Sequence, residues 1–362
     1  MEDPNQQDAS TRAHESSSIF VPPSIDCNRL FSGDSFSYYS NYPRAITPQD
    51  VSSPSTTAPV PDQTPISPST SSEDDYLVLG VDEAGRGPVL GPMVYSAFYL
   101  PQKLHHSLLA RDYSFDDSKV LTPAVRANLM QLICTPGNPL FESCGFATKL
   151  LSARDISAGM MRPAPGVYNL NAQAMDATVE IIRGIVEVRK INVREVYIDT
   201  IGNPAVYQQK LERIFPTLKI TVAKKADSLY PCVSAASVAA KVTRDVALEL
   251  CHAEVSRAQQ CEADLEFSSS VSWGSGYPSD SKCVNWMRKN MDPVFGWGNE
   301  CRFSWGTSKE MLESKTGTTV DWPVEDDENT QFADFLLTSN GSLRGSDQEL
   351  RDWFGSRTPE IL

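Results

Sequence analysis

The sequence predicts an α/β fold in which a mixed sheet of about five strands is flanked by helices. Strand-like apolar runs come first, starting at residue 76, and helical and strand-like segments then alternate to about residue 255. We expect the core at 76–255 and a C-terminal helical part at 256–315. Both ends of the chain are polar, and 316–362 is expected to be an acidic, flexible tail.

Residues 1–75 form the N-terminal segment and are rich in Ser, Thr, Pro, Gln and Asn, without hydrophobic periodicity. Such a composition buries too little apolar surface to offset the entropy lost on ordering the chain. We therefore expect this whole segment to be a disordered extension.

The elements of the core follow from the spacing of its apolar residues. The opening runs predict a β-meander, and Ile181, Ile182 and Ile185 recur at helical spacing in a later segment. We expect strands at 76–82, 92–100, 141–150, 195–199 and 219–223, and helices at 122–133, 170–190, 204–214 and 231–255. Functional groups in such sheets gather at strand ends.

Composition limits the classes of protein that need to be considered. No apolar run reaches membrane-spanning length and no signal-peptide pattern opens the chain, so a soluble, intracellular protein is expected. The eight cysteines form no Cys-X-X-Cys pair, which favours reduced thiols and argues against a zinc site. There are only four histidines, and we expect the adjacent His105 and His106 on a surface loop. Carboxylates are therefore the better candidates for hydrolytic chemistry.

The net charge of −14 is concentrated at the two ends of the chain. Counting Lys and Arg against Asp and Glu gives −8 for 1–75, +1 for 76–315 and −7 for 316–362. The middle is nearly neutral although it contains clustered acids, so its basic residues are available to face phosphates. The overall charge therefore does not exclude a nucleic-acid partner.

Residues 80–92 read Gly-Val-Asp-Glu-Ala-Gly-Arg-Gly-Pro-Val-Leu-Gly-Pro, in which an apolar strand leads two carboxylates into a glycine-rich turn. Adjacent acids at a strand end can hold hard cations, while a Gly-X-Gly turn lets backbone N–H groups approach an anion. This combination indicates metal-dependent phosphate chemistry. A solvated turn is the alternative for this element taken alone.

Acids also follow two later strands. Asp82 and Glu83 end the first strand, Asp199 ends Val-Tyr-Ile-Asp, and Asp227 follows the strand at 219–223. If these strands are neighbours, the carboxylates converge and repel one another unless cations neutralise them. Two Mg²⁺ or Mn²⁺ ions could then activate a water for phosphodiester hydrolysis. Each acid alone could equally be an ordinary turn residue.

The motifs taken together resemble type 2 ribonuclease H, the ribonuclease HII family, and within it the fungal-like eukaryotic catalytic A subunit. The resemblance spans about 76–313. It rests on the glycine-rich segment at 80–95, Asp117-Ser118-Lys119, Asp199-Thr200-Ile201-Gly202, Lys225-Ala226-Asp227, Tyr230-Pro231, Ser234-Ala-Ala-Ser237, Lys241-Val-Thr-Arg244-Asp245 and Gly274-Ser-Gly-Tyr277-Pro278.

The resemblance implies a ribonuclease H-like fold and a defined set of site residues. It assigns catalysis and metal binding to Asp82, Glu83, Asp199 and Asp227, and substrate binding to Gly85, Arg86, Gly87, Asp117, Ser118, Lys119 and Tyr277. Family members hydrolyse RNA in RNA–DNA hybrids and cut 5′ of single ribonucleotides in duplex DNA, leaving a 3′-hydroxyl and a 5′-phosphate. Recognition of one 2′-hydroxyl explains the need for a glycine turn and a tyrosine hydroxyl.

Several residues keep two interpretations at this point. Tyr277 could instead be a packing anchor, and the roles of Ser234 and Ser237 stay open. Lys241 and Arg244 could form a phosphate-binding ridge or a pair that stabilises the fold.

The resemblance also implies partners and a location. Eukaryotic relatives work as heterotrimers with two accessory subunits, which we expect to dock beyond about residue 285. The substrate implies an enzyme of DNA replication and ribonucleotide excision repair that is located in the nucleus, with the cytoplasm as a second location. The alternatives are another two-metal nuclease of the same fold or a non-catalytic nucleic-acid-binding subunit.

Overall fold

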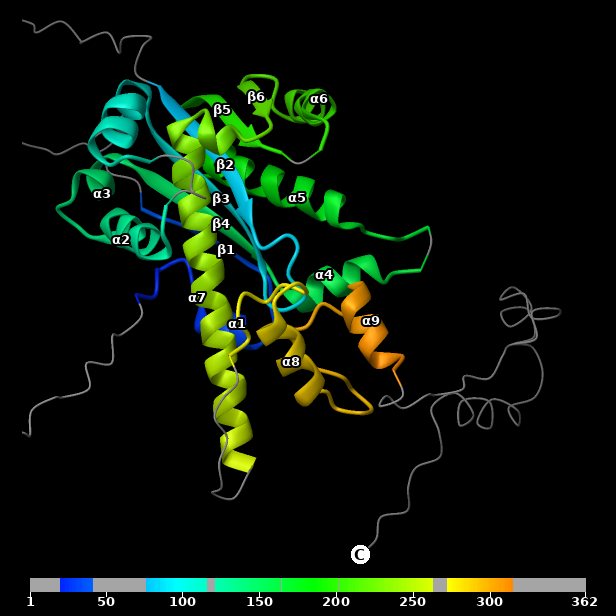
Figure 1. The fold of residues 1–362 in the computed structure, drawn as a ribbon. Helices are drawn as coiled ribbons and strands as arrows, with labels where there is room; N and C mark the ends of the chain where they lie inside the picture. Colours follow the sequence, from blue (N-terminus) through cyan, green and yellow to red (C-terminus); the bar gives the residue numbers. More distant parts are fainter. Residues whose placement is uncertain are drawn as a thin grey trace, which may run out of the picture. The chain divides into compact units, whose positions relative to one another are not determined.

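A computed structural model describes residues 20–41, 76–115, 121–163, 165–200, 202–262 and 272–314, apart from the side chains of 259–262. Within these ranges the chain forms one six-stranded sheet with helices on both faces (Figure 1). The expected mixed sheet flanked by helices is thus confirmed, with one strand more than predicted.

The sheet has the strand order β1-β4-β3-β2-β5-β6. Its strands are β1 (Phe36–Tyr39), β2 (Leu77–Ala84), β3 (Met93–Pro101), β4 (Gly145–Leu151), β5 (Val193–Asp199) and β6 (Lys219–Ala223). Strands β2, β3 and β4 form the expected antiparallel meander, and β2, β5 and β6 run parallel to one another. Parallel pairing brings the ends of β2 and β5 to the same edge of the sheet.

Each face of the sheet is covered by a long helix. On one face, Leu79 of β2 belongs to a core cluster with Ile181 and Ile182 of α5 (Leu170–Arg183). On the other, Val78 clusters with Val233 and neighbouring apolar residues of α7 (Pro231–Glu262), which crosses the sheet in Figure 1. Alternate residues of β2 therefore point to opposite helices, so the strand is buried on both faces.

Shorter helices complete the described part of the chain. They are α1 (Cys27–Phe31), α2 (Pro123–Cys134), α3 (Pro139–Ser143), α4 (Ala153–Met160), α6 (Pro204–Ile214), α8 (Ser281–Lys289) and α9 (Gly306–Leu312). A 3₁₀ turn at Gln102–Leu104, π-helical turns at His105–Asp112 and Gly184–Val188, and a 3₁₀ turn at Ala226–Ser228 lie between them.

The prediction of disorder across the first 75 residues is wrong for 20–41. Strand β1 pairs with β4 and forms an edge of the sheet, and the Ser35 hydroxyl donates a hydrogen bond to Asp155 at 2.6 Å. Ser24 and Thr243 form a buried hydroxyl pair at 2.8 Å. Long-range partners order this short segment, and composition averaged over 1–75 does not reveal them. The remaining residues of 1–75 lie outside the described ranges.

Two local expectations also need correction. The strand expected at 141–150 begins only at Gly145, because Asn138 caps the short helix α3 and Pro139 starts it. His105 is not on a surface loop: it is buried, and its Nε2 accepts a hydrogen bond from the Cys232 N–H at 3.1 Å. Burial and the neighbouring His106 lower the pKa of His105 to about 4.

The structure also bears on membrane insertion and cysteine pairing. Within the described ranges, no helix has the length and apolar character needed to cross a membrane. The seven described cysteines are free thiols distributed between core and surface.

Candidate active site

Three of the predicted acids meet at the ends of neighbouring parallel strands. Val81 of β2 pairs with Ile198 of β5, so the next residues, Asp82 and Asp199, lie where the pairing of these two strands ends. Glu83 follows Asp82 and lies opposite Tyr95 of β3. The sequence places these acids at strand ends, and the parallel pairing brings them together.

Asp227 joins this group through a short turn. It lies in the 3₁₀ turn after β6 and is buried. The Ala226 N–H of the same turn donates to Asp199 Oδ1 at 2.8 Å, which ties the turn to the end of β5. All four predicted acids line one cleft of about 420 Å³.

Two of the acids, Asp82 and Glu83, have raised pKa values. Burial first, and then the negative charge of Glu83, raise the pKa of Asp82 well above its ordinary value, while a hydrogen bond from Ser237 opposes the rise. Burial and the charge of Asp199 raise the pKa of Glu83 to about 7, although Arg86 partly offsets them. Such mutual shifts are typical of carboxylates that share a functional site.

The donor set of this cleft suits hard divalent cations. The described residues that line it contribute carboxylates, hydroxyl groups and basic side chains, with no histidine or cysteine among them. Oxygen donors of this kind are the ligands of Mg²⁺ and Mn²⁺. No three described His, Cys, Asp or Glu side chains are already grouped tightly enough to hold an ion.

Gly85 and Arg86 of the Gly85-Arg86-Gly87 turn also line the cleft. Gly85 has φ +79°, and a Cβ there would lie 2.6 Å from the Pro92 carbonyl oxygen. A Cβ on Gly87 would lie 3.1 Å from Cε1 of Tyr277, so the tyrosine ring packs against this glycine. The two elements predicted to read the sugar therefore face each other, and Tyr277 remains 37% exposed for contact with a ligand.

The Arg86 side chain lies between the acid cleft and a neighbouring cavity. Its guanidinium donates to the Asn171 side-chain oxygen and interacts with Glu83 and Tyr95. It lines both the acid cleft and an adjacent cavity of about 450 Å³ between α5 and α6. In this arrangement, Arg86 links Asn171 of α5 to the acid cleft at Glu83.

The structure shows which contacts Lys241 and Arg244 have within the protein. Both line the cleft. Arg244 donates to Asp245 and to the Ser275 carbonyl oxygen, and its guanidinium lies 5.4 Å from the centre of the Tyr277 ring. Arg244 thus supports the turn that carries Tyr277, and a phosphate-binding role for Lys241 and Arg244 stays a prediction.

Several cleft residues were not singled out from the sequence. Arg126 of α2 lines the cleft, and no local motif marks it. Ser237, whose role was open, now has a partner in Asp82. The predicted substrate-binding residues Asp117, Ser118 and Lys119 lie outside the described ranges.

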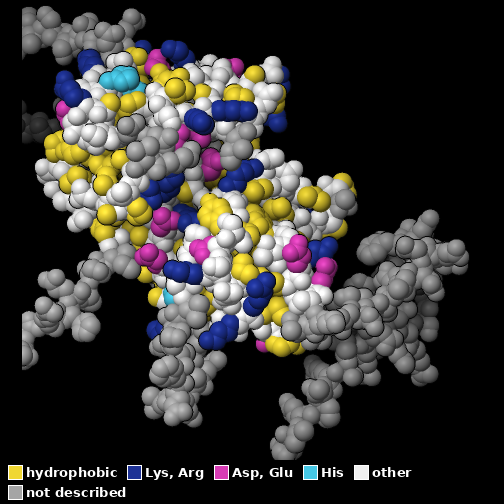
Figure 2. Space-filling view, in the orientation of Figure 1, with side chains coloured by type: hydrophobic (Ala, Val, Ile, Leu, Met, Phe, Trp, Pro, Cys, Tyr) yellow, Lys and Arg dark blue, Asp and Glu magenta, His cyan; other side chains and the backbone are white. Residues whose placement is uncertain are grey.

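Figure 2 shows basic side chains beside acidic ones in the middle of the visible face.

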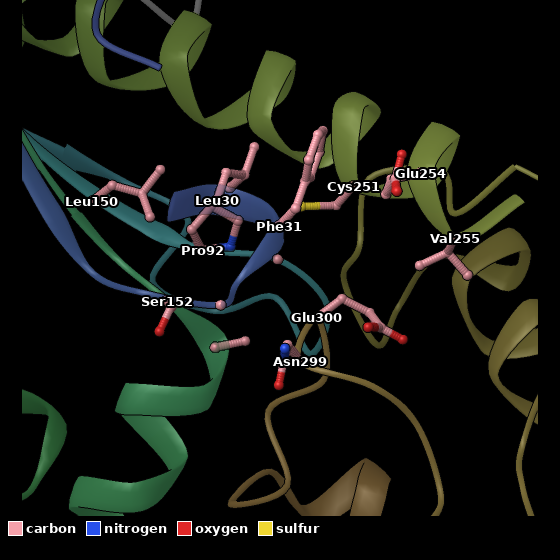
Figure 3. Close-up of a pocket in the computed structure, with 13 residues that line it drawn as sticks. Leu30, Phe31, Pro92, Leu150, Ser152, Cys251, Glu254, Val255, Asn299 and Glu300 are labelled. Carbon is pink, nitrogen blue, oxygen red and sulfur yellow. The ribbon is translucent and has the colours of Figure 1, made fainter. Parts of the chain in front are cut away.

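A smaller cavity of about 70 Å³ lies away from these residues. It is enclosed by α1, α7, the end of β4 and the loop at Asn299 and Glu300, as Figure 3 shows. Its lining is mainly apolar, and none of the four predicted acids contributes to it. The acid cleft is therefore the better candidate for the active site.

The chain is similar to known proteins over most of its described length. The family described as Ribonuclease HII matches residues 79–308. The ribonuclease H2 A subunit of Neurospora crassa is 52% identical, over 93% of this chain and 95% of the relative. The Schizosaccharomyces pombe protein of the same name is 44% identical, over 77% and 79%. The crystal structure of ribonuclease H2 from Pyrococcus horikoshii superposes with a TM-score of 0.49 at 27% identity, covering 66% of this chain and 97% of that one.

The family match and the relatives define this protein as a ribonuclease, an enzyme of the hydrolase class. The chain belongs to the ribonuclease HII family, and its curated relatives are ribonuclease H2 A subunits. The resemblance inferred from the motifs is thereby confirmed.

Proposed function

We propose that this chain is the catalytic subunit of a metal-dependent endoribonuclease that hydrolyses RNA in RNA–DNA hybrids and incises 5′ of single ribonucleotides in duplex DNA. The observation that carries the proposal is the convergence of Asp82, Glu83, Asp199 and Asp227 on one cleft, whose lining also includes Gly85, Arg86 and Tyr277. In this proposal the four carboxylates support hydrolysis, and the Gly85–Gly87 turn and Tyr277 contact the sugar.

The four acids are the residues that would hold two divalent ions, Mg²⁺ or Mn²⁺. When bound, such ions activate a water and stabilise the leaving oxygen in an in-line displacement, which leaves a 3′-hydroxyl and a 5′-phosphate. The chain keeps the acids in place through Ser237, which hydrogen-bonds Asp82, and through the Ala226 amide on Asp199. Arg86 limits the repulsion at Glu83.

We attribute sugar selection to the Gly85–Gly87 turn and to Tyr277, which lie beside the acids. Backbone groups of Gly85–Gly87 can meet a 2′-hydroxyl closely because no side chain stands at either glycine. The Tyr277 hydroxyl can contact the same sugar, while its ring stays packed against Gly87. A cleft that requires this contact disfavours deoxyribose. Without a 2′-hydroxyl, the polar groups of the protein that face the sugar would be left unpaired.

The proposal extends to assembly and location. The relatives are named as subunits, so we place this chain in a complex with two accessory subunits that dock on the part beyond residue 285. We also propose that the protein acts in the nucleus, where genomic DNA is found, with the cytoplasm as a second location.

The test is cleavage of a matched set of duplexes: all-DNA, DNA with one ribonucleotide, and an RNA–DNA hybrid. Each is incubated with Mg²⁺, Mn²⁺ or EDTA, using the chain alone and co-expressed with its accessory subunits. We expect metal-dependent cleavage of the two ribonucleotide-containing duplexes only. Asp227→Asn should abolish it, because this change removes one negative charge from the acid group.

Asp176→Asn is the matched control. Asp176 lines the adjacent cavity, accepts a hydrogen bond from Tyr168 and is not one of the four acids. The Asp176→Asn variant should cleave both ribonucleotide-containing duplexes at the wild-type rate. Equal cleavage of the all-DNA duplex would contradict sugar selection, and binding without any cleavage in the full complex would favour a non-catalytic nucleic-acid-binding subunit.

A further inference from the structure

The Gly85–Gly87 turn is held from beneath by residues more than 200 positions later in the chain. Arg302 is completely buried, and its guanidinium donates to three carbonyl oxygens: Gly91 at 3.0 Å, Arg86 at 3.0 Å and Gly85 at 2.6 Å. These bonds use the planar fork of donors that only arginine provides.

Trp305 holds the third residue of the same turn. Its indole Nε1–H donates to the Gly87 carbonyl oxygen at 3.0 Å. The Arg302 guanidinium lies 4.8 Å from the centre of the Trp305 ring, so the two side chains also support each other. Carbonyls of all three residues in the turn are thus fixed by this pair.

Backbone pairing reinforces the connection. The Arg302 N–H donates to the Val89 carbonyl at 2.9 Å, the Gly91 N–H donates to Glu300 at 2.8 Å, and Leu90 and Cys301 form an antiparallel bridge. Among the described residues, no carboxylate forms an ion pair with Arg302. Its charge is therefore balanced mainly by the carbonyl dipoles of the turn.

We propose that Arg302 and Trp305 are positioning residues that fix the Gly85–Gly87 turn in the geometry needed to read the 2′-hydroxyl. With the carbonyls tied down on the inner side, the turn keeps its approach to Tyr277 and to the sugar. This role rests on the proposed function, because it concerns the same cleft. It assigns a catalytic consequence to residues that never touch the substrate.

A pair of tryptophan variants separates positioning from general stability. Trp305→Phe keeps an aromatic ring and removes the N–H that reaches Gly87. Trp297→Phe is the matched control: Trp297 is buried in the same C-terminal part, and its Nε1–H donates to the Met287 carbonyl at 2.9 Å, away from the turn. Each change removes one indole-to-carbonyl hydrogen bond, so both should lower the Tm by similar amounts.

The first readout is amide hydrogen exchange of a peptide covering 84–91, which requires no activity. Trp305→Phe should accelerate exchange in this peptide by about threefold to tenfold, the effect of one hydrogen bond, while Trp297→Phe leaves it unchanged. Unchanged exchange in Trp305→Phe would overturn the proposal, as would equal acceleration in the two variants.

The second readout is steady-state cleavage of the single-ribonucleotide duplex at a temperature where every variant is folded. Trp305→Phe should lose about tenfold in kcat with KM within about twofold, because phosphate contacts dominate duplex affinity. Trp297→Phe should match the wild type. Arg302→Lys should recover part of the activity that Arg302→Gln loses. Loss in KM alone, or equal loss in both tryptophan variants, would contradict a positioning role.

The two readouts also separate this proposal from the one on which it rests. If the wild-type protein cleaves none of the duplexes, the proposed function fails. The exchange pattern of 84–91 would then still support or overturn the role of Arg302 and Trp305 in holding the turn.

Discussion

Asp199 Oδ1 accepts the Ala226 N–H at 2.8 Å, so the acid at the end of β5 also anchors the turn that carries Asp227. One side chain thus contributes charge to the cleft and geometry to its neighbour. The two contributions can be separated, because an amide oxygen accepts the same hydrogen bond without the charge.

Asp199→Asn should therefore raise the stability of the metal-free protein while weakening its response to metal. Removing one negative charge from the group of acids stabilises the fold by about 1–3 kcal/mol, which corresponds to a Tm increase of a few degrees. Thermal unfolding in EDTA and in Mg²⁺ measures both effects. A lower Tm in EDTA would show that the charge is structural, contrary to this account.

The pH dependence of metal-free stability provides a second test. The pKa of Glu83 is raised to about 7 in the folded state by burial and by Asp199. A carboxyl whose folded-state pKa is raised binds its proton more tightly in the folded protein, so the stabilising contribution of Glu83 is greatest at low pH. This contribution to the free energy of unfolding should fall by up to about 3 kcal/mol as pH rises from about 4.5 through 7.

Divalent cations should reverse that trend, because they favour the ionised carboxylates. The Mg²⁺-induced increase in Tm should grow between pH 5 and pH 8, roughly in parallel with the loss seen in EDTA. A metal-induced shift that is independent of pH would mean that the ions bind away from Glu83.

Substitution of the two glycines of the turn should have different consequences. Gly85→Ala places a side chain at φ +79° against the Pro92 carbonyl and should destabilise the protein by about 2 kcal/mol or more. Gly87→Ala should leave the Tm nearly unchanged but push Tyr277 outward, and reduce ribonucleotide cleavage by about tenfold.

Two other glycines serve as controls for this pair. Gly137 has φ +80° and open space around its Cβ position, so Gly137→Ala reports the backbone cost alone. Gly306 also has open space and no positive φ, so Gly306→Ala should be neutral. If Gly87→Ala cleaves like Gly306→Ala, the close approach to Tyr277 has no functional role.

The N-terminal strand should contribute measurably to stability. Asp155 accepts hydrogen bonds from both the Ser35 N–H and the Ser35 hydroxyl, at 3.1 and 2.6 Å. Asp155→Ala should cost about 1–3 kcal/mol, measured by urea unfolding. Asp112→Ala, which removes only an exposed pair with Arg111, should change stability by less than about 0.5 kcal/mol. Similar values for the two variants would contradict the structural role of Ser35.

Local patterns predicted the parts of the fold that are stabilised locally. The runs around Leu79 and Val196 are buried strand interiors, and the apolar spacing of Ile181 and Ile182 marks the inner face of α5. Strand β1 escaped prediction because its partners, β4 and Asp155, are more than 100 positions away. Composition averaged over 1–75 cannot detect such a pairing.

The same distinction applies to the site. Asp82 and Asp199 could be predicted because each follows a recognisable strand, and parallel pairing then brings them together. Arg302 could not, because its acceptors lie 211 to 217 positions earlier and no motif surrounds it. The sequence therefore predicts the grouping of the acids better than it predicts the distant contacts that hold the glycine turn.

The most direct test of the central claim is the position and chemistry of the cut in a duplex with one ribonucleotide. Water attack supported by the four acids should break the bond 5′ of the ribonucleotide, leave a 3′-hydroxyl and a 5′-phosphate, and require Mg²⁺ or Mn²⁺. End-group analysis of the isolated fragments determines this. A cut 3′ of the ribonucleotide that leaves a 2′,3′-cyclic phosphate in EDTA would mean that the 2′-hydroxyl itself attacks, and would contradict the account.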